Sequence, residues 1–580
     1  MSTTDPGQPG FTLRAVVIGV ALSLFLLMSS TYIALKLGAL PWPIIFSVIV
    51  SGGLIKALSK TGGANIHEIN TAQAGASIGG LIAAGIAFTL PGILYLNQTK
   101  GMDIAWPNPW LLGVLTSVAG LLGIMLSVPL KVRFVDEEEL PYPAGTAGAE
   151  LLKLGKTGGR QLMFVMSVGA GAAIFALLRD LYFPAGLAFA ALASYGIFLA
   201  LLPLPLAIAG GYILGHRAGF SWFAGAVIGW LLLVPLLMQN GFEAEAARAL
   251  AQNLGMGLVL GSGIGFFFNY ILPKFKAIFL PIFTARESYL KLFPWLAVLS
   301  VGILWLLGVP LFAAVLAVFG VWVTVAVAAR MTGETNIDPL EQFGIFIGLV
   351  IAFIYKFAAL ELSPFALFII VIFVSVACAV AGDAGHDYKS AHLIGTRFFD
   401  IVKIDLIAVL FAGLAAPFVF EIVRHAFKDM LFTPAMPAPQ AQLVAGSIFG
   451  FEFPQVFAAG FAIAFIGEFL NRLLPEHLKG RLLWMPMGIG LFLGFGLAIP
   501  IAVGALIRFY IDRRRSHLYQ SGLVLAAGMM GGEGIAGFSA GALTIFGLSY
   551  QTGGLILLMV FILIFLVSAV ASFKKQEGMS

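Results

Sequence analysis

Two aspartates that follow a long apolar run have the type and spacing of a proton-exchanging pair. Asp383 and Asp387 belong to the segment Gly-Asp-Ala-Gly-His-Asp-Tyr-Lys-Ser, directly after apolar residues 365–381. In a helix, residues four apart share a face, and two neighbouring carboxyl groups make each other harder to ionise. The competing interpretations are a solvated loop that continues to Arg397, or a metal site, whose spacing is not diagnostic. We predict proton exchange and no bound metal.

Polar side chains gather at the start of two apolar runs, one in each half of the chain. The first set is Asn65, His67, Glu68, Asn70 and Gln73, and the second is Asn336, Asp338, Glu341 and Gln342. Each set is preceded or overlapped by the pattern Thr-Gly-x-x-Asn-Ile, at residues 61–66 and 332–337. Ionisable and amide groups at the mouth of a membrane segment are costly unless they face a cavity or pair with one another. The repetition favours cavity lining over two ordinary polar loops.

A third candidate proton group is Glu533, which lies in the apolar segment Met-Met-Gly-Gly-Glu-Gly. An acid in such surroundings must be protonated, paired or in contact with water. The glycines around Glu533 could open the backbone and give it that contact. We therefore group it with Asp383 and Asp387 as a site of proton coupling.

An unusual turn-rich segment contains Tyr142, which we predict to line the same cavity. It reads Leu-Pro-Tyr-Pro-Ala-Gly-Thr-Ala and follows four consecutive acids at 136–139. The two prolines and the small residues predict an extended segment that enters the protein and turns into a short helix. The N-terminus of that helix could meet an anionic group.

The elements that position these residues must be membrane helices. The chain has 580 residues, of which 60% are hydrophobic and only 11% are charged, so a soluble enzyme is excluded. About seventeen apolar runs are long enough to be considered as spans. The interrupted stretch at 446–454 is our first candidate for a re-entrant segment, because broken backbone at membrane depth requires protein or water around it. We predict an all-α polytopic protein with about 16 transmembrane helices and re-entrant segments.

The charge distribution favours an N-terminus in the cytoplasm. With that orientation and about 16 spans, the basic clusters at 131–160, 274–291, 508–515 and 574–575 all lie on the cytoplasmic side, as does the C-terminus. The net charge of +5 then reflects basic loops and does not indicate a nucleic-acid partner. Cys378 is the single cysteine, so the chain has no internal disulfide and no thiolate metal cluster.

The similar stretches in the two halves predict a duplicated architecture. A weaker similarity relates residues 203–225 to residues 500–522. We place the two transmembrane repeats at residues 1–292 and 293–580. Duplicated halves with matching interrupted segments are typical of secondary transporters, which hold their substrate between the repeats.

The motifs resemble those of the oligopeptide transporter family, in particular its bacterial members and the yellow stripe-like branch that carries metal chelates. Residues 140–147 are similar to the branch's Leu-Pro-Tyr-Pro-Ser-Gly-Thr-Ala. Residues 382–390 are similar to its Gly/Cys-Asp-x-x-Gln-Asp-Phe-Lys-Thr, with His386 in place of the glutamine. The family's peptide-clade signatures Asn-Pro-Gly and Lys-Ile-Pro-Pro-Arg do not occur in this sequence.

The resemblance implies a proton-driven symporter of short oligopeptides or peptide-like metal chelates in a cell membrane. Its partners would be the small-molecule substrate, protons and the lipid bilayer, and the sequence leaves a homodimer open. No cofactor is implied. A membrane channel or an intramembrane enzyme without coupled transport is the alternative.

Overall fold

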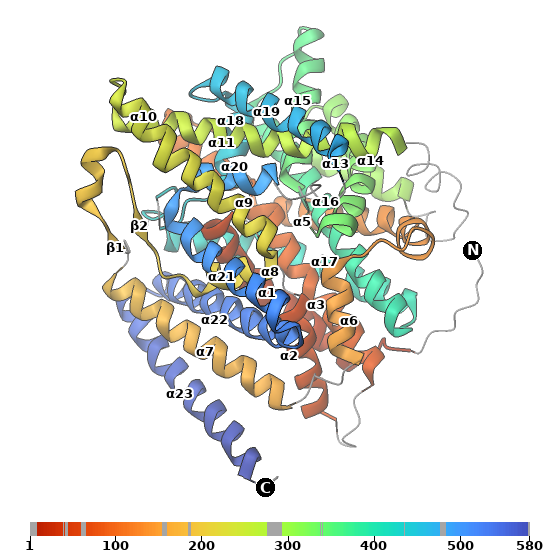
Figure 1. The fold of residues 1–580 in the computed structure, drawn as a ribbon. Coiled ribbons are helices and arrows are strands. Elements are labelled where there is room, and N and C mark those ends of the chain that lie inside the picture. Colours follow the sequence, from red (N-terminus) through yellow and green to blue (C-terminus); the bar gives the residue numbers. More distant parts are fainter. Residues whose placement is uncertain are drawn as a thin grey trace.

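The computed structural model is built almost wholly of helices (Figure 1). It describes residues 9–38, 40, 44–59, 65–153, 159–183, 187–274, 293–336, 338, 340–433, 435–475 and 483–577. Parts of the two Thr-Gly-x-x-Asn-Ile stretches, residues 61–64 and 337, lie outside the described residues. The strands of the described chain are a two-residue antiparallel pair, β1 (Leu187–Ala188) and β2 (Ala200–Leu201), in which Leu187 faces Leu201.

The described first half of the chain contains α-helices together with short π-helical and 3-10 segments. The α-helices are α1 (Leu13–Leu37), α2 (Ile44–Ala57), α3 (Ile66–Ala87), α4 (Pro91–Lys100), α5 (Pro109–Ser127), α6 (Pro143–Lys153), α7 (Gly159–Tyr182), α8 (Pro205–Leu214), α9 (His216–Val227), α10 (Val234–Gln239) and α11 (Ala244–Phe266). The π-helical and 3-10 segments are η1 (Val132–Glu137), η2 (Ala190–Tyr195), η3 (Ile228–Leu233), η4 (Phe267–Ile271) and η5 (Leu272–Lys274).

The second half contains the longest helices. They are α13 (Phe293–Leu306), α14 (Leu311–Thr335), α15 (Leu340–Phe357), α16 (Pro364–Ile394), α17 (Phe398–Ala426), α18 (Pro439–Phe449), α19 (Pro454–Leu473), α20 (Trp484–Leu493), α21 (Phe495–Arg514), η7 (Ser516–Leu518), α22 (Tyr519–Ile545) and α23 (Tyr550–Glu577). Figure 1 shows α7, α22 and α23 side by side at one edge of the molecule, and the helices pack against one another there.

The helices confirm a polytopic all-α membrane protein. Thirteen helices of the described chain are long and apolar enough to cross a bilayer, and five shorter apolar helices accompany them. A helix needs about 20 residues to cross the hydrocarbon core, so the ten-residue helices α8 and α20 reach only part of the way. The total of about 16 spans stays a prediction.

The centre of the bundle is α16. In its apolar stretch, 94% of the residues are buried inside the protein. The helix packs against α3, α5, α14, α15 and α17. A helix surrounded by protein needs no polar face, which agrees with the apolar sequence of α16. A polar residue on this helix must therefore find a protein partner or a cavity.

Close packing joins α1 to α3. An added Cβ at Gly79 of α3 would lie 1.8 Å from the backbone oxygen of Ser23 on α1, and one at Gly19 would lie 3.0 Å from the backbone oxygen of Ala72. These distances leave no room for larger side chains, so the two backbones touch.

Glycines with positive φ lie at several breaks between helices of the described chain. Gly215 separates α8 from α9, Gly494 separates α20 from α21, and Gly450 separates α18 from α19. The break at Gly450 lies in the predicted stretch 446–454. The other two breaks were not predicted from the sequence. The helices on either side of them pack together, α8 against α21 and α9 against α20.

Candidate functional site

The acid pair lies in the middle of the protein on an uninterrupted helix. Asp383 and Asp387 belong to α16, four residues apart as predicted, and their exposed fractions are 2% and 0%. The helix continues beyond them to Ile394. The solvated-loop interpretation is therefore wrong.

Helix α3 supplies the hydrogen bonds of this pair. The side-chain amide of Gln73 donates to Asp387 Oδ1 over 2.8 Å. The Ser77 hydroxyl lies 2.7 Å from Asp383 Oδ2 and 3.2 Å from Asp387 Oδ2. One hydroxyl therefore lies within hydrogen-bonding distance of both carboxyl groups, and it links them.

A third carboxyl group belongs to the same cluster. Asp405 on α17 is fully buried, and neither of its oxygens has a hydrogen-bond partner among the described residues. It interacts electrostatically with Asp383 and Asp387. Asp405 was not predicted from the sequence, although an aspartate inside the apolar segment Lys-Ile-Asp-Leu-Ile-Ala was a usable signal.

A cavity of about 90 Å³ lies beside the acid pair. Its polar lining consists of Thr332, Asn336, Asp338, Asp383 and His386, and its apolar lining comes from residue 40 and from α3, α8 and α15. Asp383 thus belongs both to the buried acid cluster and to the cavity wall.

The second polar set lies close to this cavity. Among its predicted members Asn336 lines the wall, whereas the Gln342 amide donates to Glu341 Oε1 over 2.6 Å. Asp338, a further predicted member, also lines the wall, and both of its carboxyl oxygens are buried without a partner among the described residues. Burial raises the pKa of Asp338 well above its usual range, and the nearby carboxyl groups of Glu341 and Asp383 raise it further.

Most of the first polar set serves a different purpose. Glu68 forms an ion pair with Arg14 of α1, and Asn65 caps the N-terminus of α3. Asn70 donates to Thr396 over 3.2 Å and accepts from Ser390 over 3.0 Å. In the described structure these three side chains hold α3 to its neighbours and do not line the cavity beside Asp383. Gln73 is the member that reaches the acid pair.

Tyr142 lies beside His386 of α16 and is not among the residues that line the cavity. Its hydroxyl donates to the backbone oxygen of Ala329 over 2.9 Å, and its ring lies 5.5 Å from that of His386. The predicted short helix is present as α6. The segment before it is not extended throughout, because Glu139 and Tyr142 have positive φ. The N-terminal N–H groups of α6 at Ala144 and Gly145 donate to Asn336 Oδ1 and to His386 Nδ1, so in this structure neutral side chains occupy the place predicted for an anion.

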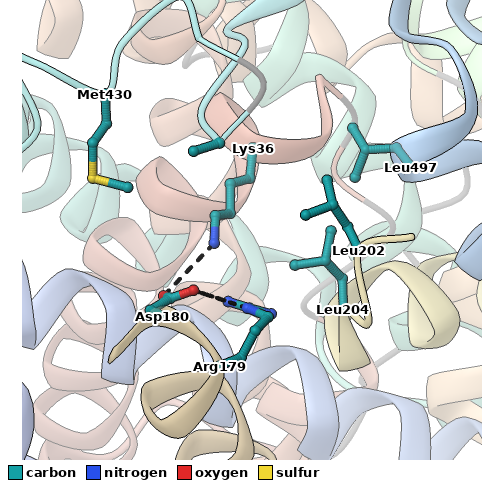
Figure 2. A pocket seen from close by; sticks show the side chains of 8 residues that line it. Lys36, Arg179, Asp180, Leu202, Leu204, Met430 and Leu497 are labelled. Atoms are coloured by element: carbon teal, nitrogen blue, oxygen red, sulfur yellow. Dashed lines mark hydrogen bonds and ion pairs between the residues drawn. The ribbon is translucent and has the colours of Figure 1, made fainter. Parts of the chain in front are cut away.

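Glu533 lies apart from Asp383 and Asp387 in a second buried charged cluster. One of its oxygens accepts from Arg179 of α7 over 2.7 Å, and the other accepts from the backbone N–H of Leu206 over 2.8 Å. The remaining members, Lys36 and Asp180, appear with Arg179 in Figure 2. Glu533 is therefore a paired carboxylate in this structure.

The arrangement around Asp383 is suited to holding protons. Three buried carboxyl groups repel one another when ionised, and a bound proton relieves that repulsion. The described residues contain no group of three or more His, Cys, Asp or Glu side chains arranged to hold a metal ion.

A bundle of membrane helices with ionisable groups buried beside a central cavity has the architecture of a membrane transporter. The chain belongs to the OPT family, because the family model described as "OPT oligopeptide transporter protein" matches residues 10–270 and 286–544. The resemblance inferred from the motifs is thereby confirmed.

Two relatives are similar over most of their length. A Haemophilus influenzae protein described as "Putative oligopeptide transporter" is 22% identical over 590 residues, which cover 87% of this chain and 91% of the relative. A rice protein (Oryza sativa subsp. japonica) described as "Probable metal-nicotianamine transporter YSL9" is 22% identical over 515 residues, 77% of this chain and 73% of the relative. Both descriptions are of transporters and neither is of an enzyme.

Proposed function

We propose that the protein is a proton-coupled symporter of short oligopeptides or peptide-like metal chelates. The observation that carries this proposal is the double position of Asp383, which lines the cavity and also shares the Ser77 hydroxyl with Asp387. A substrate entering the cavity would change the surroundings of a carboxyl group whose proton is shared with its neighbours. Binding of substrate and of proton would then depend on one another.

The size of the cavity supports a transport cycle with moving helices. Pockets that enclose small-molecule ligands usually measure about 300 Å³ or more, whereas this cavity measures about 90 Å³. The structure therefore corresponds to a closed state, and the lining helices α3, α8 and α14 would separate to admit a peptide. The broken helix at Gly215, next to the end of α8 in the cavity wall, supplies a site for such movement.

The test uses the full-length protein in liposomes with an inward proton gradient. A mixed pool of short peptides and iron chelates is offered, and mass spectrometry identifies what accumulates. We expect one class of substrate to accumulate. In the double variant Asp383→Asn/Asp387→Asn, gradient-driven uptake should fall at least about tenfold, because a proton-transfer group has been removed. The exposed Asp103→Asn variant is the matched control.

Two outcomes would contradict the proposal. Gradient-dependent uptake that survives in a monodisperse double variant would remove Asp383 and Asp387 from the coupling. Downhill flux without accumulation would instead indicate the channel alternative.

We further propose a cell-membrane location with both termini in the cytoplasm. The basic clusters at 508–515 and 574–575 support this orientation. The large apolar side chains exposed along α13, α19 and α23 face lipid or a second copy of the chain.

A further inference from the structure

The second buried cluster joins three helices around Arg179. Its guanidinium donates from Nε and Nη2 to Asp180 over 2.8 and 2.7 Å, and from Nη1 to Glu533 over 2.7 Å. The second oxygen of Glu533 accepts from the N-terminus of α8. Arg179 and Glu533 thus have hydrogen-bonded partners and are held in place.

Lys36 on the last turn of α1 is less well satisfied. Its ammonium Nζ lies 3.9 Å from Asp180 Oδ2, too far for a hydrogen bond, and 5.0 Å from the centre of the Tyr32 ring. The side chain is 7% exposed, and among the described residues no hydrogen bond of this ammonium is present. A buried ammonium without close partners is costly to keep charged.

The same ammonium faces a small cavity. Figure 2 shows Lys36 pointing toward Asp180 and Arg179, with apolar side chains on the other walls. These apolar side chains are Leu202, Leu204, Met430 and Leu497. The cavity volume is about 20 Å³, enough for about one water molecule, which could carry a proton between Lys36 and Asp180.

The charges of the cluster balance only when Lys36 carries its proton. Lys36 and Arg179 then oppose Asp180 and Glu533, and loss of the Lys36 proton leaves one uncompensated negative charge. The polar groups around the Lys36 ammonium are Tyr32 of α1, Arg179 and Asp180 of α7, and Glu533 of α22. The described cavity lining from the segments around α8, α17 and α21 is apolar. Desolvation favours the neutral amine and the carboxylates favour the ammonium, so the balance between the two forms depends on pH and on Asp180.

We propose that Lys36 is a proton-exchanging group, whose charged form holds the end of α1 against α7 and whose neutral form releases it. This site is separate from the acid cluster on α16 and does not depend on the substrate. Movement of α1 would still reach that cluster, because α1 packs backbone to backbone on α3, and α3 donates the hydrogen bonds to Asp383 and Asp387.

Thermal unfolding of the detergent-solubilised full chain at pH 6 to 10 tests the proton exchange. Lys36→Arg keeps the positive charge, and Lys36→Met keeps the shape without it. We expect wild type to melt near the arginine variant at pH 6 and to approach the methionine variant by pH 10, with a shift of about 2–4 °C between the two limits. Lys100→Met, at an exposed position, is expected to follow wild type at every pH.

A constant difference between wild type and Lys36→Met over the whole pH range would overturn the proposal. If that variant does not fold, Asp180→Asn replaces it, and loss of the neighbouring carboxylate should move the wild-type transition to lower pH. An unmoved transition would again contradict the assignment.

The release of α1 has its own readout. In a Cys378→Ala background, which removes the single native thiol, Leu202→Cys places a thiol at the cavity wall. At alkaline pH we expect maleimide labelling to be at least about threefold faster than in the same protein carrying Lys36→Arg, and at pH 6 we expect equal rates. Equal rates at both pH values would refute the release. Neither readout involves transport, so either can fail without affecting the proposed symport.

Discussion

At the scale of single residues, burial and hydrogen bonding distinguish the acids. Glu533 has two close donors, whereas Asp405 has none among the described residues and Asp383 shares one hydroxyl with Asp387. A carboxylate with two donors is stable when charged, and a buried carboxyl group without a donor is more stable when protonated. The same chemical group can therefore be a fixed charge in one cluster and a proton carrier in the other.

Asp338, between α14 and α15, tests whether a buried carboxyl group without a donor keeps its proton. Its pKa is raised by burial above the usual 3.8, so the folded protein keeps this proton over a pH range in which the unfolded chain has lost it. Unfolding then releases a proton, and stability falls as pH rises from about 4. Asp338→Asn cannot ionise, so it should melt higher than wild type at pH 7 and equally near pH 4. Melting curves that differ by the same amount at both pH values would show that Asp338 does not titrate in this range.

The acid pair was predictable from sequence because its spacing is local. The partners of the pair were not, since Gln73 and Ser77 reach it from a helix more than 300 residues earlier in the chain. Apolar membrane helices lack the polar face that would show which side meets a neighbour. Arg179 and Glu533 illustrate the same limit, because neither sequence context shows that the two side chains meet.

At the scale of elements, glycine decides how closely α1 and α3 approach. Gly79→Ala would place a methyl group 1.8 Å from a backbone oxygen that cannot move away as a side chain could. We expect a loss of about 1–3 kcal/mol of stability, as in other overpacked interiors, and a reduced uptake because α3 carries Gln73 and Ser77. The melting temperature and the liposome assay measure these effects.

Gly302→Ala is the matched control for this substitution. Gly302 lies inside α13 with nothing within 4 Å of an added Cβ. Alanine is the better helix former, so this variant should be unchanged or more stable by about 0.5–1 kcal/mol. A Gly79 variant that behaves like the Gly302 variant would mean that α1 and α3 are not held in close contact.

At the scale of the whole molecule, some helix contacts of the first half have counterparts in the second, while the duplication itself stays a prediction. Helix α8 packs on α21, and α20 packs on α9. Gly211 of α8 contacts Ile501 of α21, and Gly490 of α20 contacts Trp222 of α9. The shift in residue number that takes Gly211 to Gly490 also takes Trp222 to Ile501. The pairs α1–α3 and α14–α16 correspond in the same way. Under this pairing α3 corresponds to α16 and not to α15. The Thr-Gly-x-x-Asn-Ile similarity precedes α3 and α15 instead, so the helix contacts and this similarity give different pairings.

The directions of these helices indicate that the halves are inverted. Helices α1 and α3 run parallel, since Gly19 meets Ala72 and Ser23 meets Gly79. Helices α14 and α16 also run parallel, because Thr332 lies beside Gly382 and Thr324 beside Cys378. In contrast, α3 and α16 are antiparallel, as shown by the contacts of Asn70 with Ser390 and of Ser77 with Asp383. The starts of α1 and α14 should therefore lie on opposite membrane surfaces.

Single cysteines in the Cys378→Ala background test this topology in intact cells. Leu13→Cys and Leu311→Cys are exposed positions at the starts of α1 and α14, and Arg397→Cys precedes α17, which begins beside α1 where Asp400 accepts from Gly10. A membrane-impermeant maleimide should label the Leu311 variant from outside, and the other two only after the cells are opened, because the basic clusters place the N-terminus inside. Labelling of all three from one side would contradict inverted halves. Labelling of Leu13 and Arg397 from outside would keep the inversion and reverse the orientation.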